Sequence, residues 1–357
     1  MKPIKVLVVD DSALMRRYIR QMLEEEGFEV YTARNGEDAL ERIKEVDPDV
    51  VTLDINMPVM DGITCLSHIM NEFPRPVIMV SSLTEKGALI TLEALQLGAV
   101  DYVTKPSGTV SLDIKKIKNE LVEKIKAVVL GRSTAKLKSR VSRIVRKTKK
   151  ETIGLKKKPA KIAGFKGLVL IGSSTGGPGT LEEILGALPA DFPLPILVAQ
   201  HMPGSFTKVF ANRLNKICEL EVVHVEKTTP LISNKIYIAK GNADVEVKKR
   251  LNRVVAESVP ESPDYLWHPS VDRMVESALK VIPAEDIIAV LLTGMGYDGA
   301  ESMAMVHRGG GKTIAESEET AIVFGMPKEL IEREGADFVL PSYKIADKLV
   351  KLARERR

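Results

Sequence analysis

The stretch Ile4-Lys5-Val6-Leu7-Val8-Val9-Asp10-Asp11-Ser12 indicates how the first part of the chain folds. Its apolar run ends in two acids, and residues 13–26 then carry apolar side chains at helical spacing. The alternation continues to residue 130, with strand-like runs at 30–33, 50–53, 77–80 and 99–103 and helical patterns at 36–44, 64–73 and 87–97. It predicts an α/β domain over residues 1–130, with a doubly wound parallel sheet covered by helices on both faces.

Polar side chains follow several of these predicted strands at the point where each strand ends. They are Asp10, Asp11, Asp54, Ser81 and Lys105. Ligands of an open parallel sheet bind beyond the carboxyl ends of its strands, so we expect these groups to converge. Clustered carboxylates suit Mg²⁺, and a lysine with a small hydroxyl suits a phosphoryl group. Helix capping would explain one aspartate but not five groups at successive strand ends.

Residues 8–12, 53–62 and 101–106 resemble the receiver domain of two-component response regulators, which has a flavodoxin-like fold. The resemblance implies that Asp54 is the phospho-acceptor. It also implies roles for the neighbouring groups: Mg²⁺ held by Asp10, Asp11, Asp54 and the backbone carbonyl of Asn56; phosphoryl contact from Lys105; and a switch pair formed by Ser81 and Tyr102. A phosphoryl group adds negative charge and strong acceptors that the Ser81 hydroxyl can reorient to meet.

Basic residues are concentrated in one segment of the chain. Residues 131–166 hold fourteen Lys or Arg and a single acid, Glu151, whereas the whole chain carries a net charge of only +4. Few large apolar residues occur there, so we interpret 131–163 as a basic linker. It could serve as an electrostatic arm for nucleic acid, membrane or an acidic partner, but its low apolar content favours a solvated tether.

Residues 164–357 form a second predicted domain. Strand-like runs at 167–171, 195–199, 222–225, 235–239, 287–292 and 312–315 alternate with helical patterns. This again predicts a mostly parallel sheet of doubly wound, Rossmann-like type. The turn Gly172-Ser173-Ser174-Thr175-Gly176 fits G-x-S-x-G, which exposes a central hydroxyl at a helix N-terminus. Nucleotide binding is disfavoured because neither G-x-G-x-x-G nor a P-loop lysine is present.

Two further turns follow strands of the same predicted sheet. His201 comes directly after the run 196–199, and Asp298 lies in Thr293-Gly294-Met295-Gly296-Tyr297-Asp298 after the most apolar strand. Ser174, His201 and Asp298 would therefore meet at one edge as nucleophile, general base and orienting acid. Their order along the chain differs from that of the α/β-hydrolases, which indicates a convergent triad. Asp298 could also cap the helix predicted over 299–307.

Residues 171–177, 200–203, 269–272 and 292–300 resemble the chemotaxis protein-glutamate methylesterases, in which a receiver precedes an esterase domain. The resemblance implies hydrolysis of γ-glutamyl methyl esters on methyl-accepting chemoreceptors, and often deamidation of receptor glutamines. It places Met295 near the oxyanion, where the amide of Thr175 would also donate, and Pro269–Asp272 close to the site. The phosphodonor would be a chemotaxis histidine kinase, with the receiver restricting entry to the Ser174 crevice until Asp54 is phosphorylated.

Composition bounds the remaining possibilities. Cys65 and Cys218 lie far apart with no metal-binding spacing, so neither a disulfide framework nor a metal in the esterase domain is expected. No apolar run reaches membrane-spanning length, and the N-terminus shows no leader pattern, so we expect a cytoplasmic protein without membrane insertion. A DNA-binding regulator would explain the basic segment, but no helix-turn-helix pattern occurs and no nucleic-acid partner is expected. A non-catalytic adaptor is the other alternative.

Overall fold

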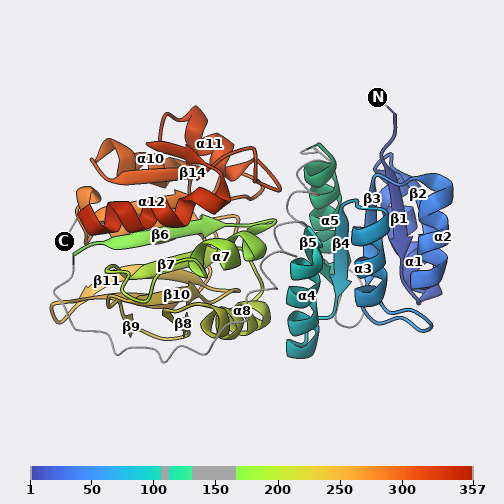
Figure 1. The fold of residues 1–357 in the computed structure, drawn as a ribbon, viewed down its shortest axis with the longest axis horizontal. Coiled ribbons are helices and arrows are strands. Elements are labelled where there is room, and N and C mark those ends of the chain that lie inside the picture. The colour runs from blue at the N-terminus through green and yellow to red at the C-terminus, as the bar shows by residue number, and fades with distance from the viewer. Residues whose placement is uncertain (1, 106–111, 131–165, 356–357) are drawn as a thin grey trace. The chain divides into compact units, whose positions relative to one another are not determined.

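The structure is a computed structural model that describes residues 2–105, 112–130 and 166–355 (Figure 1). These residues form two compact units, one on each side of the basic segment. The predicted linker, residues 131–163, lies outside the described residues. Among the described helices, none is long and apolar enough to cross a membrane.

The first unit is a five-stranded parallel sheet with strand order β2-β1-β3-β4-β5. Its strands are β1 (Lys5–Val9), β2 (Glu29–Ala33), β3 (Val50–Asp54), β4 (Val77–Ser81) and β5 (Asp101–Thr104). Its helices are α1 (Ala13–Glu25), α2 (Gly36–Val46), α3 (Gly62–Glu72), α4 (Glu85–Leu97) and α5 (Leu112–Leu130). This is the flavodoxin-like order, and it confirms the fold predicted for the first domain.

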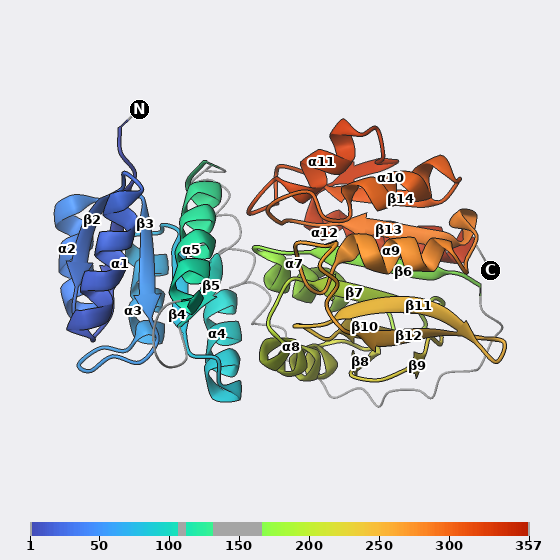
Figure 2. The same ribbon diagram turned by 180° about the vertical axis from the view of Figure 1, so that it is seen from behind.

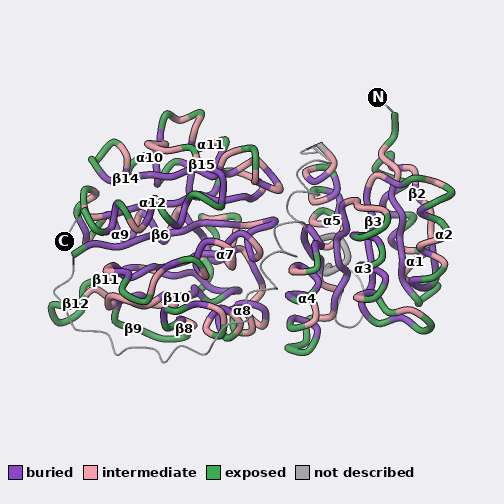
Figure 3. Tube along the Cα trace, in the orientation of Figure 1, coloured by how far each residue is buried: buried purple, intermediate pink, exposed green. Residues whose placement is uncertain are grey.

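The central strands of this sheet are buried along their whole length. Every residue of β3 and β4 is buried, which requires helices on both faces and explains their mostly apolar sequences (Figure 3). Asp54 is a carboxylate at the buried carboxyl end of β3. The sheet therefore presents its functional groups at one edge.

The second unit is built on a seven-stranded sheet with order β15-β14-β13-β6-β7-β10-β8, and its paired strands run parallel. The strands are β6 (Leu168–Ser173), β7 (Ile196–Gln200), β8 (Glu221–Val225), β10 (Lys235–Ala239), β13 (Ile287–Leu291), β14 (Lys312–Glu316) and β15 (Phe338–Leu340). β6 lies between β7 and β13, so the chain builds outward from β6 first on one side and then on the other. Ligands bind at such a topological switch point.

Helices cover both faces of this sheet. They are α7 (Gly177–Leu185), α8 (Gly204–Ile217), α9 (Val271–Leu279), α10 (Ala300–Arg308), α11 (Met326–Glu332) and α12 (Ser342–Glu355), with a short 3₁₀ turn η1 (Ala284–Asp286). α7 and α12 pack together on the face seen in Figure 1, and α9 lies on the opposite face, which Figure 2 shows. The apolar side of α9, including Met274 and Ala278, is buried against the sheet.

A small antiparallel sheet was not predicted. It consists of β9 (Thr229–Pro230), β11 (Asp244–Arg250) and β12 (Arg253–Val259), in the order β11-β12-β9. β11 and β12 mix charged and apolar residues, so they lack the continuous apolar runs that marked the parallel strands. Leu251 and Asn252 both adopt positive φ, 45° and 62°, and close the hairpin without the usual glycine.

Candidate functional site

Ser174 lies on the turn between β6 and α7, at the centre of the second sheet. Its amide donates a hydrogen bond of 3.0 Å to the carbonyl of Thr293, which ties the turn to the loop after β13. A Cβ atom at Gly294 would lie 2.8 Å from the Cβ of Ser174, so this loop can approach the serine only because residue 294 is glycine. Ser174 itself is partly exposed.

His201 follows β7, the neighbour of β6, and its amide donates to the carbonyl of Ser173 at 3.0 Å. The buried side chain of Gln200 holds the two turns together. It accepts from the Ser173 hydroxyl at 2.6 Å and donates from Nε2 to the carbonyls of Ser174 and His201, each at 3.0 Å. Gln200 had no predicted role, although its position at the end of an apolar strand was a signal.

The imidazole of His201 uses its two nitrogens differently. Nε2 lies 2.8 Å from Oδ2 of Asp298, whereas Nδ1 is buried and has no hydrogen-bond partner among the described residues. Because an ionised carboxylate only accepts, Nε2 carries a proton, and in the neutral ring the lone pair is then on Nδ1. Neither nitrogen is hydrogen-bonded to the Ser174 hydroxyl in this structure.

Asp298 is almost fully buried and receives donors from the N-terminus of α9. The Ser270 hydroxyl donates to Oδ1 at 3.1 Å, and the amides of Val271 and Asp272 donate at 2.7 and 2.9 Å. Burial alone would raise the pKa of Asp298, but the hydrogen bonds from His201 and from these amides lower it. The carboxylate therefore stays ionised beside the imidazole.

Asp298 does not cap α10, the helix that follows it. The N-cap of α10 is Gly299, which has no side-chain capping bond. Asp298 instead accepts bonds at the first turn of α9, which is remote in sequence. The resemblance had placed Pro269–Asp272 close to the site, and the structure gives Ser270, Val271 and Asp272 their contacts there.

Asp272 is a second carboxyl group next to Asp298. Its side chain accepts from the hydroxyl of Ser302 at 2.6 Å and so links α9 to α10. Burial, and secondarily the charge of Asp298, raises the pKa of Asp272 to about 6. Of the two neighbouring acids, Asp298 keeps the charge because it has the imidazole and three further donors.

Two backbone amides near Ser174 are free to donate. Those of Thr175 and Met295 make no hydrogen bond to any other described residue. Their loops are fixed from behind, because the Thr293 hydroxyl donates to the carbonyl of Thr175 at 2.9 Å and the Thr293 amide donates to buried Glu316 at 2.8 Å. Free amides at a serine turn suit an oxyanion.

The acidic edge of the first sheet is equally well defined. Asp10, Asp11 and Asp54 each offer a carboxylate oxygen, and these oxygens lie within 4.8 Å of one another. Lys105 Nζ lies 2.8 Å from Oδ2 of Asp54 and 2.9 Å from Oδ2 of Asp10. Oδ2 of Asp10 is buried and, apart from this ion pair, has no hydrogen-bond partner among the described residues.

Helix capping does not explain the two N-terminal acids. The N-cap of α1 is Ser12, whose hydroxyl oxygen accepts from the amide of Met15. Oδ1 of Asp10 accepts from the Ser12 amide at 2.9 Å, and Asp11 is exposed. The capping alternative is therefore wrong for both residues, which leaves their carboxylates to the acidic cluster.

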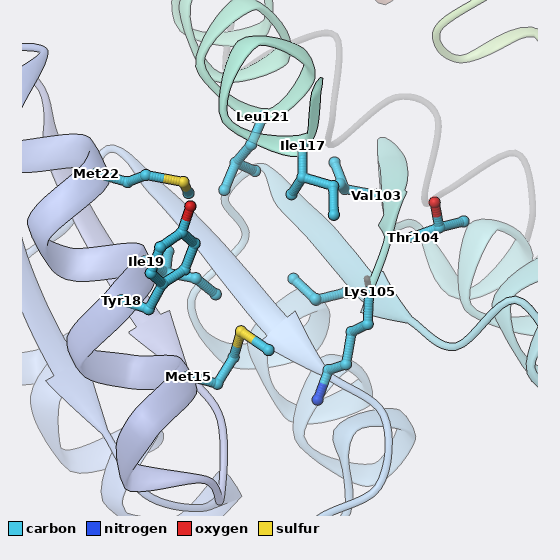
Figure 4. A pocket seen from close by; sticks show the side chains of 10 residues that line it. Met15, Tyr18, Ile19, Met22, Val103, Thr104, Lys105, Ile117 and Leu121 are labelled. Atoms are coloured by element: carbon cyan, nitrogen blue, oxygen red, sulfur yellow. The ribbon is translucent and has the colours of Figure 1, made fainter. Parts of the chain in front are cut away.

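Burial and charge act in opposite directions at this edge. Burial raises the pKa of Asp54, and Lys105 only partly offsets it. Burial alone would lower the pKa of Lys105, but the carboxylates of Asp54 and Asp10 raise it. Both pKa values are therefore raised, because burial dominates at Asp54 and the two carboxylates dominate at Lys105. The Lys105 stem borders a small apolar pocket of about 20 Å³ between α1 and α5 (Figure 4).

The other receiver residues lie around this edge. The Ser81 hydroxyl oxygen accepts from Thr91 of α4 at 2.7 Å, and the amide of Lys105 donates to the Ser81 carbonyl. Tyr102 is buried, and burial raises the pKa of its phenol. Asn56 is exposed just beyond Asp54. Thr91, which links Ser81 to α4, had not been singled out from the sequence.

Two family models match the chain, a response regulator receiver domain over residues 6–116 and CheB methylesterase over residues 169–349. The chain belongs to the CheB methylesterase family. A protein-glutamate methylesterase/protein-glutamine glutaminase of Rhodospirillum rubrum is 54% identical over 97% of this chain and 95% of its own length. One from Carboxydothermus hydrogenoformans is 49% identical over 99% of this chain and 100% of its own length.

A solved structure agrees with this assignment. The crystal structure of the Thermotoga maritima CheB methylesterase catalytic domain is 42% identical, with a TM-score of 0.50, and the match covers 52% of this chain and 98% of that one. The predicted receiver, the predicted esterase domain and the prediction of a methylesterase enzyme are thus confirmed.

Proposed function

We propose that this CheB family member removes methyl groups from γ-glutamyl methyl esters of methyl-accepting chemoreceptors and deamidates receptor glutamines. The site supports an acyl-enzyme mechanism in which Ser174 is the nucleophile and His201 the general base, oriented by Asp298. The observation that carries the proposal is the geometry of His201, whose Nε2 lies 2.8 Å from Oδ2 of Asp298 while its buried Nδ1 has no hydrogen-bond partner among the described residues. The base is thus Nδ1, the opposite nitrogen from that of chymotrypsin-like proteases.

In the first step the Ser174 oxygen attacks the ester carbonyl and Nδ1 of His201 takes the hydroxyl proton. The bond between these two groups would form on substrate binding, as catalytic hydrogen bonds often do. The amides of Thr175 and Met295 would donate to the oxyanion, and one such donor is typically worth about 2.7–4 kcal/mol. His201 returns the proton to the leaving methanol.

Water then attacks the acyl-enzyme, with His201 again taking a proton, and releases the glutamate side chain and Ser174. A glutamine substrate would pass through the same acyl intermediate, with ammonia leaving in place of methanol. One site therefore serves both reactions. Exposure of Ser174 to a receptor side chain is compatible with its partly open position.

The receiver unit supports control by phosphorylation. Asp54 would accept the phosphoryl group from a chemotaxis histidine kinase, and Asp10, Asp11 and Asp54 with the carbonyl of Asn56 would hold Mg²⁺. Carboxylate and carbonyl oxygens fit this ion, and its charge would favour ionised Asp54 against the effect of burial. Lys105 would contact the phosphoryl oxygens, and Ser81 with Tyr102 would transmit the change.

The decisive experiment measures methanol release from a methylated chemoreceptor by the wild type and by Ser174→Ala. We expect the variant to lose turnover while its circular dichroism spectrum stays unchanged. A folded Ser174→Ala protein with wild-type turnover would rule out serine chemistry. A serine-directed phosphonate should label the wild type but not this variant, which also separates the enzyme from a non-catalytic adaptor.

A further inference from the structure

Trp267, the single tryptophan of the chain, stacks on the imidazole of His201. The ring centroids are 5.9 Å apart, and the two planes differ by only 5°. Trp267 lies in the segment before α9 and is only partly exposed. Neither the serine mechanism nor the motifs in the sequence assign it a role.

The indole is held in this position from its other sides. The Tyr297 ring meets it edge-on, with centroids 5.1 Å apart and an interplanar angle of 86°. Gly296 lies against the six-membered ring, where a Cβ would come within 2.7 Å of Trp267 Cζ2. Gly296 also has φ 81°, so both its conformation and its contact demand glycine. The loop that carries Asp298 thus packs closely against Trp267.

The segment that carries Trp267 is anchored by a fully buried acid, Asp244. Its Oδ1 lies 2.9 Å from Nδ1 of His268 and accepts from the amide of Ser270 at 2.8 Å, while Oδ2 pairs with Arg273 at 2.8 Å. These bonds fix the residues on the C-terminal side of the indole. Trp267 is therefore a preorganised aromatic surface rather than a mobile side chain.

We propose that Trp267 is a positioning residue for His201, which keeps the imidazole plane aligned for Asp298 and stabilises the imidazolium formed when His201 takes the serine proton. An aromatic face attracts a cation within about 6 Å but gives a neutral imidazole much less. Trp267 would therefore stabilise the transition state, in which His201 is protonated, more than the ground state, and this difference raises kcat. This inference rests on the proposed role of His201 as base.

Several other titratable groups lie near the stacked pair. Asp298 bonds the imidazole, and Asp272 of α9 lies beside Asp298. His268 adjoins Trp267 in the chain and is bonded to Asp244, and Tyr297 contacts the indole edge. His201 is the imidazole that stacks on the indole. A change in indole emission caused by His201 must therefore disappear when His201 alone is replaced.

The first test compares Trp267→Phe with Trp267→Leu in the full-length chain, using methanol release from a methylated chemoreceptor. We expect Trp267→Leu to lower kcat about fivefold with little change in KM, and Trp267→Phe to retain most of the rate. Tyr343→Leu removes an exposed aromatic of the same unit and serves as the control. Equal kcat values for the Leu and wild-type proteins would overturn the proposal.

The second test uses the emission of Trp267, which is the only indole. Because the imidazole stacks on the indole, we expect the emission of Trp267 to differ between the wild type and His201→Gln and to stay unchanged in His268→Gln. Identical emission of the wild type and His201→Gln, or a change seen only in His268→Gln, would overturn the stacking role.

The two tests separate this inference from the proposed mechanism. If Ser174→Ala retains turnover, the serine mechanism fails whatever Trp267 does. If Ser174→Ala is inactive but Trp267→Leu keeps the wild-type kcat, the mechanism stands and the positioning role of Trp267 fails. Circular dichroism spectra check that every variant is folded like the wild type.

Discussion

Nε2 of His201 lies 2.8 Å from Oδ2 of Asp298, and this pair joins the ends of β7 and β13 across the central strand β6. The carboxylate sets the tautomer of the ring, because an acceptor on one side requires the proton on Nε2. The free lone pair on Nδ1 follows from that single contact. The chemistry of the site therefore depends on Asp298 remaining an acceptor.

Asp298→Asn should deprive His201 of its basic Nδ1 lone pair while keeping a side chain of the same shape at position 298. An asparagine amide can donate to Nε2, which moves the ring proton to Nδ1 and leaves no lone pair for the serine proton. By analogy with the serine-protease variant, kcat should fall about 10⁴-fold. Methanol release measures it. Asp337→Asn alters another His–Asp contact of the same unit, with His307, and should leave kcat nearly unchanged. Similar losses in both variants would contradict the tautomer argument.

Ser270→Ala should lower both the stability of the esterase unit and its kcat. The hydroxyl oxygen of Ser270 accepts from the amide of Arg273 as the N-cap, and the hydroxyl donates to Asp298. Loss of the cap should cost about 1 kcal/mol of stability. Loss of the donor should lower kcat about fivefold.

Urea unfolding followed by Trp267 emission measures the stability of the esterase unit alone, since that unit holds the only tryptophan. The matched control is Asn35→Ala, which removes the N-cap of α2 in the receiver unit. It should change neither the Trp267-monitored transition nor kcat. A Ser270→Ala protein with wild-type kcat and lowered stability would reduce Ser270 to a structural cap.

Asp272→Asn should stabilise the esterase unit at neutral and higher pH. The pKa of Asp272 is raised from 3.8 to about 6, so its contribution to stability is present below pH 3.8 and is lost as the pH rises to about 6. Asparagine keeps an oxygen acceptor for Ser302 but carries no charge next to Asp298. The shift corresponds to at most about 3 kcal/mol, and we expect about 1 kcal/mol after relaxation.

Urea unfolding at about pH 8 and about pH 4 tests this sign. The variant should be more stable than the wild type at the higher pH, and the difference should shrink or reverse at the lower pH. A pH-independent difference would show that Asp272 does not titrate as its surroundings require.

Sequence patterns located the strands that carry the functional groups. Ser174 and Asp54 could be placed because each follows a buried apolar run, and the carboxyl ends of parallel strands share one edge. Gln200 could be seen at a strand end, but its clamp between two turns depends on the register of Ser173 with Gln200. The register between strands that are distant in sequence is set by side-chain packing, and packing cannot be read from a single sequence.

Contacts that depend on tertiary packing were beyond prediction. Ser270 reaches Asp298 only because α9 packs on the sheet with its first turn facing the end of β13. The stacking of Trp267 on His201 requires the Asp244 anchor and the space at Gly296. The hairpin of β11 and β12 lacked both a continuous apolar run and a glycine turn, so neither signal for a strand was present.

Asp11→Asn should lower Mg²⁺ affinity while leaving the fold unchanged. Asp11 is exposed at the acidic edge, whereas Asp10 also bonds Ser12 and pairs with Lys105, so Asp11 is the cleaner substitution. Loss of one carboxylate ligand should weaken binding about tenfold or more, as measured by titration calorimetry. Glu37→Gln removes an exposed charge on α2 and should change the affinity little. Equal effects would indicate long-range electrostatics rather than coordination.

Phosphorylation should raise the esterase rate through Asp54 and Ser81. A tenfold shift between two states needs only about 1.4 kcal/mol, which a new phosphoryl contact with the Ser81 hydroxyl can supply. Methanol release with and without a small phosphodonor should therefore increase for the wild type. Asp54→Asn should keep the basal rate and lose the response, since it has no carboxylate to phosphorylate.

Ser81→Ala separates phosphorylation from its transmission. The hydroxyl oxygen of Ser81 now accepts from Thr91, so turning toward a phosphoryl group would release that bond and change the contact between β4 and α4. The variant should still take up phosphate on Asp54, as shown by mass spectrometry, yet gain little activity. Full activation of Ser81→Ala would place the switch elsewhere in the receiver. A response to phosphodonor that survives in Asp54→Asn would instead mean that the activating phosphoryl group is not on Asp54.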